Sequence, residues 1–163
     1  MNQTYMKEKK IFPLVMSMAL PMMLSMAFNS LYNIVDSYFV AKLSEDAMTA
    51  LSLVYPAQNL LTAVAVGFGV GVNAMISFYL GAQNQEKADK TATQGMELGV
   101  LHGVLLMILF LCGMNWFLGM FTKSDTVRAL GMEYSNVVFL FSTIVTGGIT
   151  LEKIFQAVGR MRA

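Results

Sequence analysis

Charged side chains are scarce in this sequence. Of its 163 residues, 13% are charged, against roughly 25% in an ordinary soluble domain. No charged side chain occurs from Ile11 to Val35, and hydrophobic residues make up 56% of the chain. This balance excludes an ordinary soluble domain and predicts a membrane protein.

Other absences exclude whole classes of function. A net charge of +1 provides no basic surface for nucleic acid. The lone cysteine, Cys112, cannot form a disulfide within the chain and matches no metal or redox spacing. The sequence also lacks an HExxH zinc pair, a GxSxG elbow and a pair of intramembrane aspartates, which argues against an intramembrane enzyme. We therefore expect neither an enzyme nor a cofactor.

Four charge-free runs are long enough, or nearly so, to cross a bilayer. A spanning helix needs roughly 20 residues to cross ~30 Å of hydrocarbon. The runs do not alternate in polarity, which excludes a membrane β-barrel. The predicted fold is an all-α membrane protein with about four transmembrane helices, at about 11–41, 48–80, 93–120 and 127–156.

Basic residues predict the orientation, because cytoplasmic loops carry an excess of lysine and arginine. With the N-terminus in the cytoplasm, the inner side carries Lys7, Lys9, Lys10, Lys87, Lys90, Lys153, Arg160 and Arg162, and the outer side Lys42, Lys123 and Arg128. This excess favours a cytoplasmic N-terminus. The alternative, a cleaved signal peptide ending near Ala27, is disfavoured because the apolar run continues beyond that residue and three more spans follow.

Asp36 follows the first charge-free run. It lies ~38 Å from Ile11 at helical rise, so position alone leaves it between the outer headgroups and a cavity inside the membrane. Asn29, Tyr32 and Asp36 fall at i, i+3 and i+7, on one helical face that Asn33 flanks. Such a polar face suits the wall of an aqueous cavity. A carboxylate there can hold a proton or Na⁺, and the residues alone do not separate the two.

Two backbone features lie inside the predicted helices. Pro21 removes a helical hydrogen bond in the first span, which predicts either a bend accommodated by packing or a hinge. Gly67, Gly69 and Gly71 resemble a nucleotide loop but lack its strand-to-helix context. We interpret these glycines as sites of close helix packing or local flexibility.

The histidine and several aromatic residues of the predicted spans are interpreted as structural. His102 lies within the third span, where we expect a neutral, hydrogen-bonded histidine inside the bundle rather than a functional group. Tyr38, Trp116 and Tyr134 lie near predicted span ends, which is typical of the aromatic belt at the membrane interface.

Two motifs follow each other in a particular order along the chain. The first is a proline early in a helix that ends in D-x-x-F-V, and the second is a glycine-rich helix leading into a L-G-A-x-N-x-E-x-A loop. They lie in the segments LPMMLSMAFNSLYNIVDSYFVAKLSEDAMTALSLVYP and GFGVGVNAMISFYLGAQNQEKAD, and QAVGRMRA follows near the end. In this order the segments resemble the N-terminal portion of multidrug and toxic compound extrusion (MATE) transporters.

The resemblance implies roles for particular residues. MATE transporters are twelve-helix antiporters that export organic, mostly cationic compounds in exchange for H⁺ or Na⁺. Asp36 matches the coupling aspartate of their first helix, and Pro21 matches a proline linked to bending of that helix. Tyr32 and Asn29 match polar cavity positions, and Asn59 is a weaker match on the second helix.

Residues 1–163 are accordingly expected to form a partial N-terminal lobe that needs further helices of the same parent chain. The expected surroundings are membrane lipid, small cationic substrates and a bacterial or archaeal cytoplasmic membrane that the chain crosses several times. Two alternatives stay open: a lipid-linked saccharide flippase of the same superfamily, and a membrane scaffold subunit without transport. The predicted spans carry lysine and arginine only at their edges, which favours cationic cargo over an anionic lipid.

Overall fold

The structure is a computed structural model that describes residues 10–159, and within that range every regular element is an α-helix. The helices are α2 (Ile11–Leu43), α3 (Glu45–Gly81), α4 (Gln85–Phe121), α5 (Asp125–Leu140) and α6 (Ser142–Ala157). The first three are long and apolar enough to span a membrane, and the bent pair of α5 and α6 is a candidate fourth span. The predicted fold class is confirmed.

Some predictions fall outside what the structure describes. Lys7, Lys9, Arg160 and Arg162, which contribute to the predicted orientation, lie outside residues 10–159. Asn29 lies in α2, but its side chain is not among those described. The cytoplasmic N-terminus and the role of Asn29 therefore stay predictions, and "outer" and "inner" below refer to the predicted orientation.

Three helices begin earlier than predicted, at residues 45, 85 and 125 instead of about 48, 93 and 127. Each starts directly after a side chain whose oxygen accepts a hydrogen bond from a backbone N–H of the first turn, an arrangement that stabilises a helix N-terminus. The pairs are Ser44 with Ala47 (3.0 Å), Asn84 with Lys87 (3.0 Å) and Ser124 with Val127 (3.3 Å). The sequence predicts loops for these polar segments, whereas in the structure they form the capped first turns of the three helices.

The prediction of one helix over 127–156 is wrong, because α5 and α6 meet at a 45° bend. The carbonyl of Phe141 accepts from the N–H groups of both Ile144 (3.0 Å) and Val145 (3.1 Å), so the hydrogen-bond ladder is irregular there. Ser142 donates its hydroxyl to the Gly103 carbonyl of α4 at 3.5 Å. This contact joins the start of α6 to α4.

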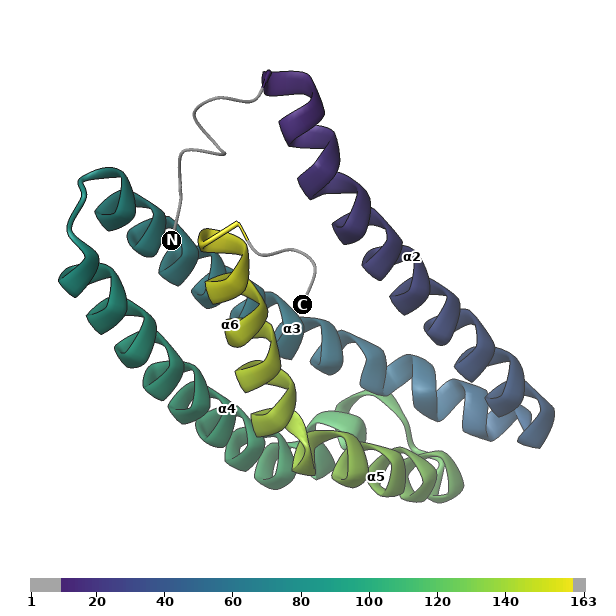
Figure 1. Cartoon of the computed structure of the whole chain (residues 1–163). Coiled ribbons are helices and arrows are strands. Elements are labelled where there is room, and N and C mark those ends of the chain that lie inside the picture. Colours follow the sequence, from purple (N-terminus) through teal and green to yellow (C-terminus); the bar gives the residue numbers. More distant parts are fainter. Residues whose placement is uncertain (1–9, 160–163) are drawn as a thin grey trace.

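Helices α3, α4 and α6 pack against one another, and α5 packs on α3 and α4. Figure 1 shows α2 approaching α3 near the turn that joins them and lying apart from α4 and α6. The apolar core toward the outer side contains Val54, Ala57, Leu61, Phe110, Met114, Leu118 and Phe139. A smaller cluster lies toward the inner side and contains Val72, Ile76, Ala88 and Ala157.

Glycine residues allow neighbouring helices to approach one another closely. Gly95, Gly99 and Gly103 are buried four residues apart on one face of α4, a spacing typical of close packing between membrane helices. A Cβ on Gly95 would meet Val72 of α3, and one on Gly99 would meet Thr150 of α6. This glycine stripe was missed in the sequence.

The predicted packing role of the α3 glycines is confirmed at one position. Gly69 is buried, and a Cβ there would lie 2.8 Å from Cγ of Lys153. Lys153 is only 9% exposed, and its ammonium group contacts Glu152 at 3.3 Å. No atom lies within 4 Å of a Cβ built on Gly67 or Gly71, so these two do not serve close packing among the described residues.

Gln83→Gly is expected to stabilise the fold by about 0.5–1 kcal/mol, since a left-handed conformation costs an L-residue more than glycine. Gln83 has φ 56° and follows the end of α3. Its N–H donates to the Leu80 carbonyl, and the N–H of Asn84 donates to the Tyr79 carbonyl. This pair of bonds ends many helices, and glycine is the usual residue at the position of Gln83. Thermal unfolding of the purified protein in detergent measures the change. Gln94→Gly, inside α4, is the control and is expected to lower stability; a lower stability for Gln83→Gly would contradict this account.

Candidate functional site

Polar side chains from three helices line a cavity of about 280 Å³ around Asp36. Its lining consists of Asn33, Asp36 and Ser37 of α2, Met48, Leu51, Ser52, Tyr55 and Gln58 of α3, and Tyr134 of α5. Asp36 is the acidic side chain of this lining, and the other side chains are neutral. We call this space the Asp36 cavity.

A second cavity of about 470 Å³ adjoins the first and shares Asn33 and Gln58 with it. Its other lining residues are Tyr32, Leu61, Thr62, Val138, Phe139, Ser142 and Val145. Both sides of the bend between α5 and α6 contribute to this wall. The second cavity is more apolar than the Asp36 cavity, and its polar groups are two amides and three hydroxyl groups.

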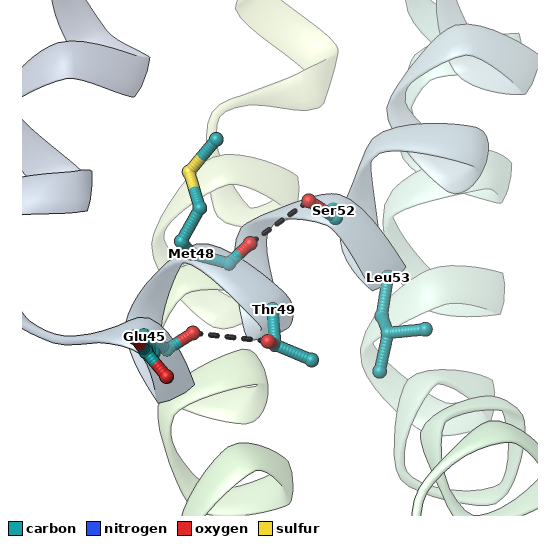
Figure 2. Close-up of a pocket in the computed structure, with 5 residues that line it drawn as sticks. All are labelled: Glu45, Met48, Thr49, Ser52 and Leu53. Atoms are coloured by element: carbon teal, nitrogen blue, oxygen red, sulfur yellow. Dashed lines mark hydrogen bonds between the residues drawn. The ribbon is translucent and has the colours of Figure 1, made fainter.

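A third hollow, the outer groove, lies at the start of α3 and measures about 420 Å³. Figure 2 shows its lining residues Glu45, Met48, Thr49, Ser52 and Leu53. Met48 and Ser52 also line the Asp36 cavity. The three hollows therefore form a series along α3, from its outer end to the middle of the bundle.

A hydrogen bond across the bundle fixes one wall of the Asp36 cavity. Gln58 donates from Nε2 to the phenolic oxygen of Tyr134 at 3.2 Å, joining α3 to α5. Tyr134 lines this cavity and accepts from the half-buried Gln58, and its place in the aromatic belt stays a prediction. Tyr38 and Trp116 are exposed, at 57% and 72%, and their place at the interface stays a prediction.

The structure brings together some of the predicted site residues. Asp36, which is half-buried, and Asn33 line the same cavity, and Tyr32 lines the adjoining one although it is 70% exposed. Asn59 is exposed and is not among the residues that line the three hollows. Pro21 lies inside α2, which continues as one helix through it.

His102 is hydrogen-bonded, as predicted, and its partner lies in its own helix. Its Nδ1 lies 2.7 Å from the Leu98 carbonyl oxygen. A carbonyl only accepts, so this nitrogen carries the proton. The ring stacks on Phe68 of α3 at 4.7 Å between centroids. It is half-buried between α3 and α4 and is not in the lining of the three hollows.

Cavities between apolar helices of spanning length are typical of transporters. Comparison with known proteins identifies the family. The MatE family model matches residues 21–163. The chain belongs to this family. A relative, the multidrug export protein MepA of Staphylococcus aureus (strain NCTC 8325 / PS 47), is 27% identical over 156 residues, which cover 95% of this chain and 35% of MepA.

Solved MATE structures share the fold. One described as MATE in the bent conformation matches with a TM-score of 0.82 and 28% identity. One described as MATE in the straight conformation matches with 0.85 and 27%. Each alignment covers 91% of this chain and 33% of the solved one. The chain thus spans about a third of the length of these relatives, of which MepA is named as a multidrug export protein.

Proposed function

We propose that this MatE chain forms part of a multidrug exporter that acts with further helices to expel organic, mostly cationic compounds in exchange for H⁺ or Na⁺. The observation that carries the proposal is a single carboxylate, Asp36, in a cavity whose other lining residues are neutral. Ionisable groups inside spanning segments are costly and mark ion or substrate pathways. The named function of MepA, multidrug export, supports the same conclusion.

In this proposal Asp36 alternately holds the coupling ion and releases it as cargo binds. Asn33 and Tyr32 belong to the cavity walls beside it, and Asn29 lies one turn before them on α2. Asn59 is the weakest candidate because it is exposed and outside the lining. The proposed membrane is a bacterial or archaeal cytoplasmic membrane, crossed several times.

Pro21 is proposed as a hinge of α2. The ring leaves one helical hydrogen bond unformed, and α2 contacts chiefly α3, so few contacts oppose its bending. Solved relatives described as bent and as straight support two shapes of this fold. Bending at Pro21 would move Asp36 relative to α3 and change the cavity that they share.

The test is transport by the complete transporter in inside-out vesicles, whose lumen corresponds to the outer side. A fluorescent organic cation is expected to accumulate in the lumen when the lumen is acidic or rich in Na⁺, because outward ion flow drives inward cargo flow. Imposing each gradient separately identifies the ion, and collapsing it is the control.

The flippase alternative predicts transport of an anionic lipid-linked saccharide instead of an organic cation. A flippase for an anionic lipid-linked saccharide needs cationic groups toward its substrate, and the Asp36 cavity has an acidic one. Movement of a lipid-linked saccharide across the same vesicles, without transport of the organic cation, would contradict the proposed function. Transport of neither substrate under any gradient would favour the scaffold.

A further inference from the structure

Gln58 lies at the boundary between the Asp36 cavity and the second cavity and belongs to the lining of both. Its side chain is half-buried, and Nε2 donates to the phenolic oxygen of Tyr134 at 3.2 Å. Tyr134 lines the Asp36 cavity and is not in the lining of the second cavity. The amide nitrogen of Gln58 is therefore bound on the side of the Asp36 cavity.

This hydrogen bond determines which atom the amide of Gln58 offers to a ligand. The oxygen and the nitrogen of an amide leave one planar carbon in different directions, and only the oxygen accepts hydrogen bonds. Because Nε2 is held by Tyr134, Oε1 is turned away from that phenol. Gln58 also borders the second cavity, where Oε1 is the atom of its amide that is left to meet a ligand.

The second cavity has the size and the lining of a site for a small organic molecule. Its volume of about 470 Å³ lies in the range of roughly 300–1,000 Å³ that is typical of ligand pockets. The apolar part of its wall comes from Leu61, Val138, Phe139 and Val145. In pockets of this kind the apolar wall binds the body of the ligand, and a few fixed polar groups set its orientation.

An amphipathic cation with an N–H group fits both features. A protonated amine donates charge-assisted hydrogen bonds, which are stronger than neutral ones, and an amide oxygen accepts them. The Asp36 carboxylate in the adjoining cavity attracts any cation, whatever donors that cation carries. A phosphonium cation has the same charge as a protonated amine but no N–H to donate. The two kinds of cation therefore differ in what Gln58 can recognise.

We propose that Gln58 is a specificity-determining residue, whose side-chain oxygen accepts a hydrogen bond from protonated-amine cargo in the second cavity. Tyr134 is the positioning residue that holds the amide in this orientation. This inference rests on the proposed function and adds to it a preference for organic cations that carry N–H groups. Asp36 then recognises the charge of the cargo, and Gln58 recognises its hydrogen-bond donor.

Gln58→Leu tests the assignment with two cargoes in vesicles that contain the complete transporter. One cargo is a dye with a protonated amine, and the other is tetraphenylphosphonium. The concentration for half-maximal export of the amine is expected to rise about tenfold, the equivalent of one hydrogen bond to a charged group. The value for tetraphenylphosphonium is expected to stay equal or to fall, because leucine leaves no polar atom to desolvate. A merely structural role of Gln58 would impair both cargoes.

Tyr134→Phe tests the orientation of the amide. It keeps the ring and removes the oxygen that binds Nε2, so the amine value is expected to rise, but by less than in Gln58→Leu. The double variant is expected to match Gln58→Leu, because both changes act through one oxygen and are not additive. Gln94→Leu, at an exposed position of α4, is the matched control and is expected to change neither value.

The outcomes separate this inference from the proposed function. An unchanged amine value in Gln58→Leu, equal losses for both cargoes, or additive effects of the two single variants would each overturn the assignment. In each of these cases the exporter function stands if the unaltered transporter exports the organic cations in response to an ion gradient. Export of neither cation by the unaltered transporter would overturn the proposed function and this inference with it.

Discussion

Gly103→Val is expected to destabilise the protein by about 3 kcal/mol or more, the upper range for overpacking a tight core. A Cβ on Gly103 would lie 2.8 Å from the Cα of Thr143, which is backbone and cannot rotate away. The added side chain would push the start of α6 off α4 and break the contact of Ser142 with the Gly103 carbonyl. Ser142 and Val145 of α6 line the second cavity, so its wall would move as well.

Gly113→Val on the same helix is the matched control. No atom lies within 4 Å of a Cβ built on Gly113, so the same change is expected to cost little there. Thermal unfolding in detergent and the yield of folded protein measure both variants. Equal stability of Gly103→Val and Gly113→Val would contradict the packing role assigned to the glycine stripe.

Asp36→Asn is expected to reduce gradient-driven export of an organic cation to the level of empty vesicles. Asparagine has nearly the same shape as aspartate and keeps polar atoms in the cavity, but it can neither carry a charge nor give up a proton in the range where a carboxyl does. The fold should survive, because removing a charge from a spanning helix relieves a cost of roughly 2.5–3.5 kcal/mol on insertion scales. Retained stability with lost export separates a coupling role from a structural one.

Asp36→Glu is the companion variant, because it keeps the carboxylate on a longer side chain. It is expected to retain part of the export, with altered dependence on the ion gradient. Asp46→Asn, an exposed acidic residue in the first turn of α3, removes an equal charge away from the cavity and is expected to leave export unchanged. Loss of export in Asp46→Asn, with export retained in Asp36→Asn, would assign the coupling role to Asp46 at the outer end of α3 instead of Asp36.

The sequence predicted the helices well where charge was absent and poorly where polar residues were helical. The charge-free runs identified the spans, because hydrocarbon tolerates few charges. The first turns of α3, α4 and α5 are polar, and their caps at Ser44, Asn84 and Ser124 give the starts that polarity alone misplaced. The bend after Phe141 could not be predicted from the sequence, because the start of α6 packs on a helix far away along the chain: Ser142 and Gly103 are 39 residues apart.

The candidate site could be predicted along α2 but not across the bundle. The spacing of Tyr32 and Asp36 placed both on one face, and both line adjoining cavities. Gln58 and Tyr134 are 76 residues apart, so their pairing depends on how α5 packs against α3. Gln58 did carry a signal, since an amide inside a charge-free run needs a partner.

The central claim is that cargo and coupling ion exchange at Asp36. Measuring the ion released when cargo binds tests this claim most directly. Organic cation is added to the purified complete transporter, and the H⁺ or Na⁺ released is measured in a weakly buffered solution. Cargo binding is expected to release the ion from the unaltered protein and to release less from Asp36→Asn at equal cargo occupancy. Equal release from both proteins would contradict the account.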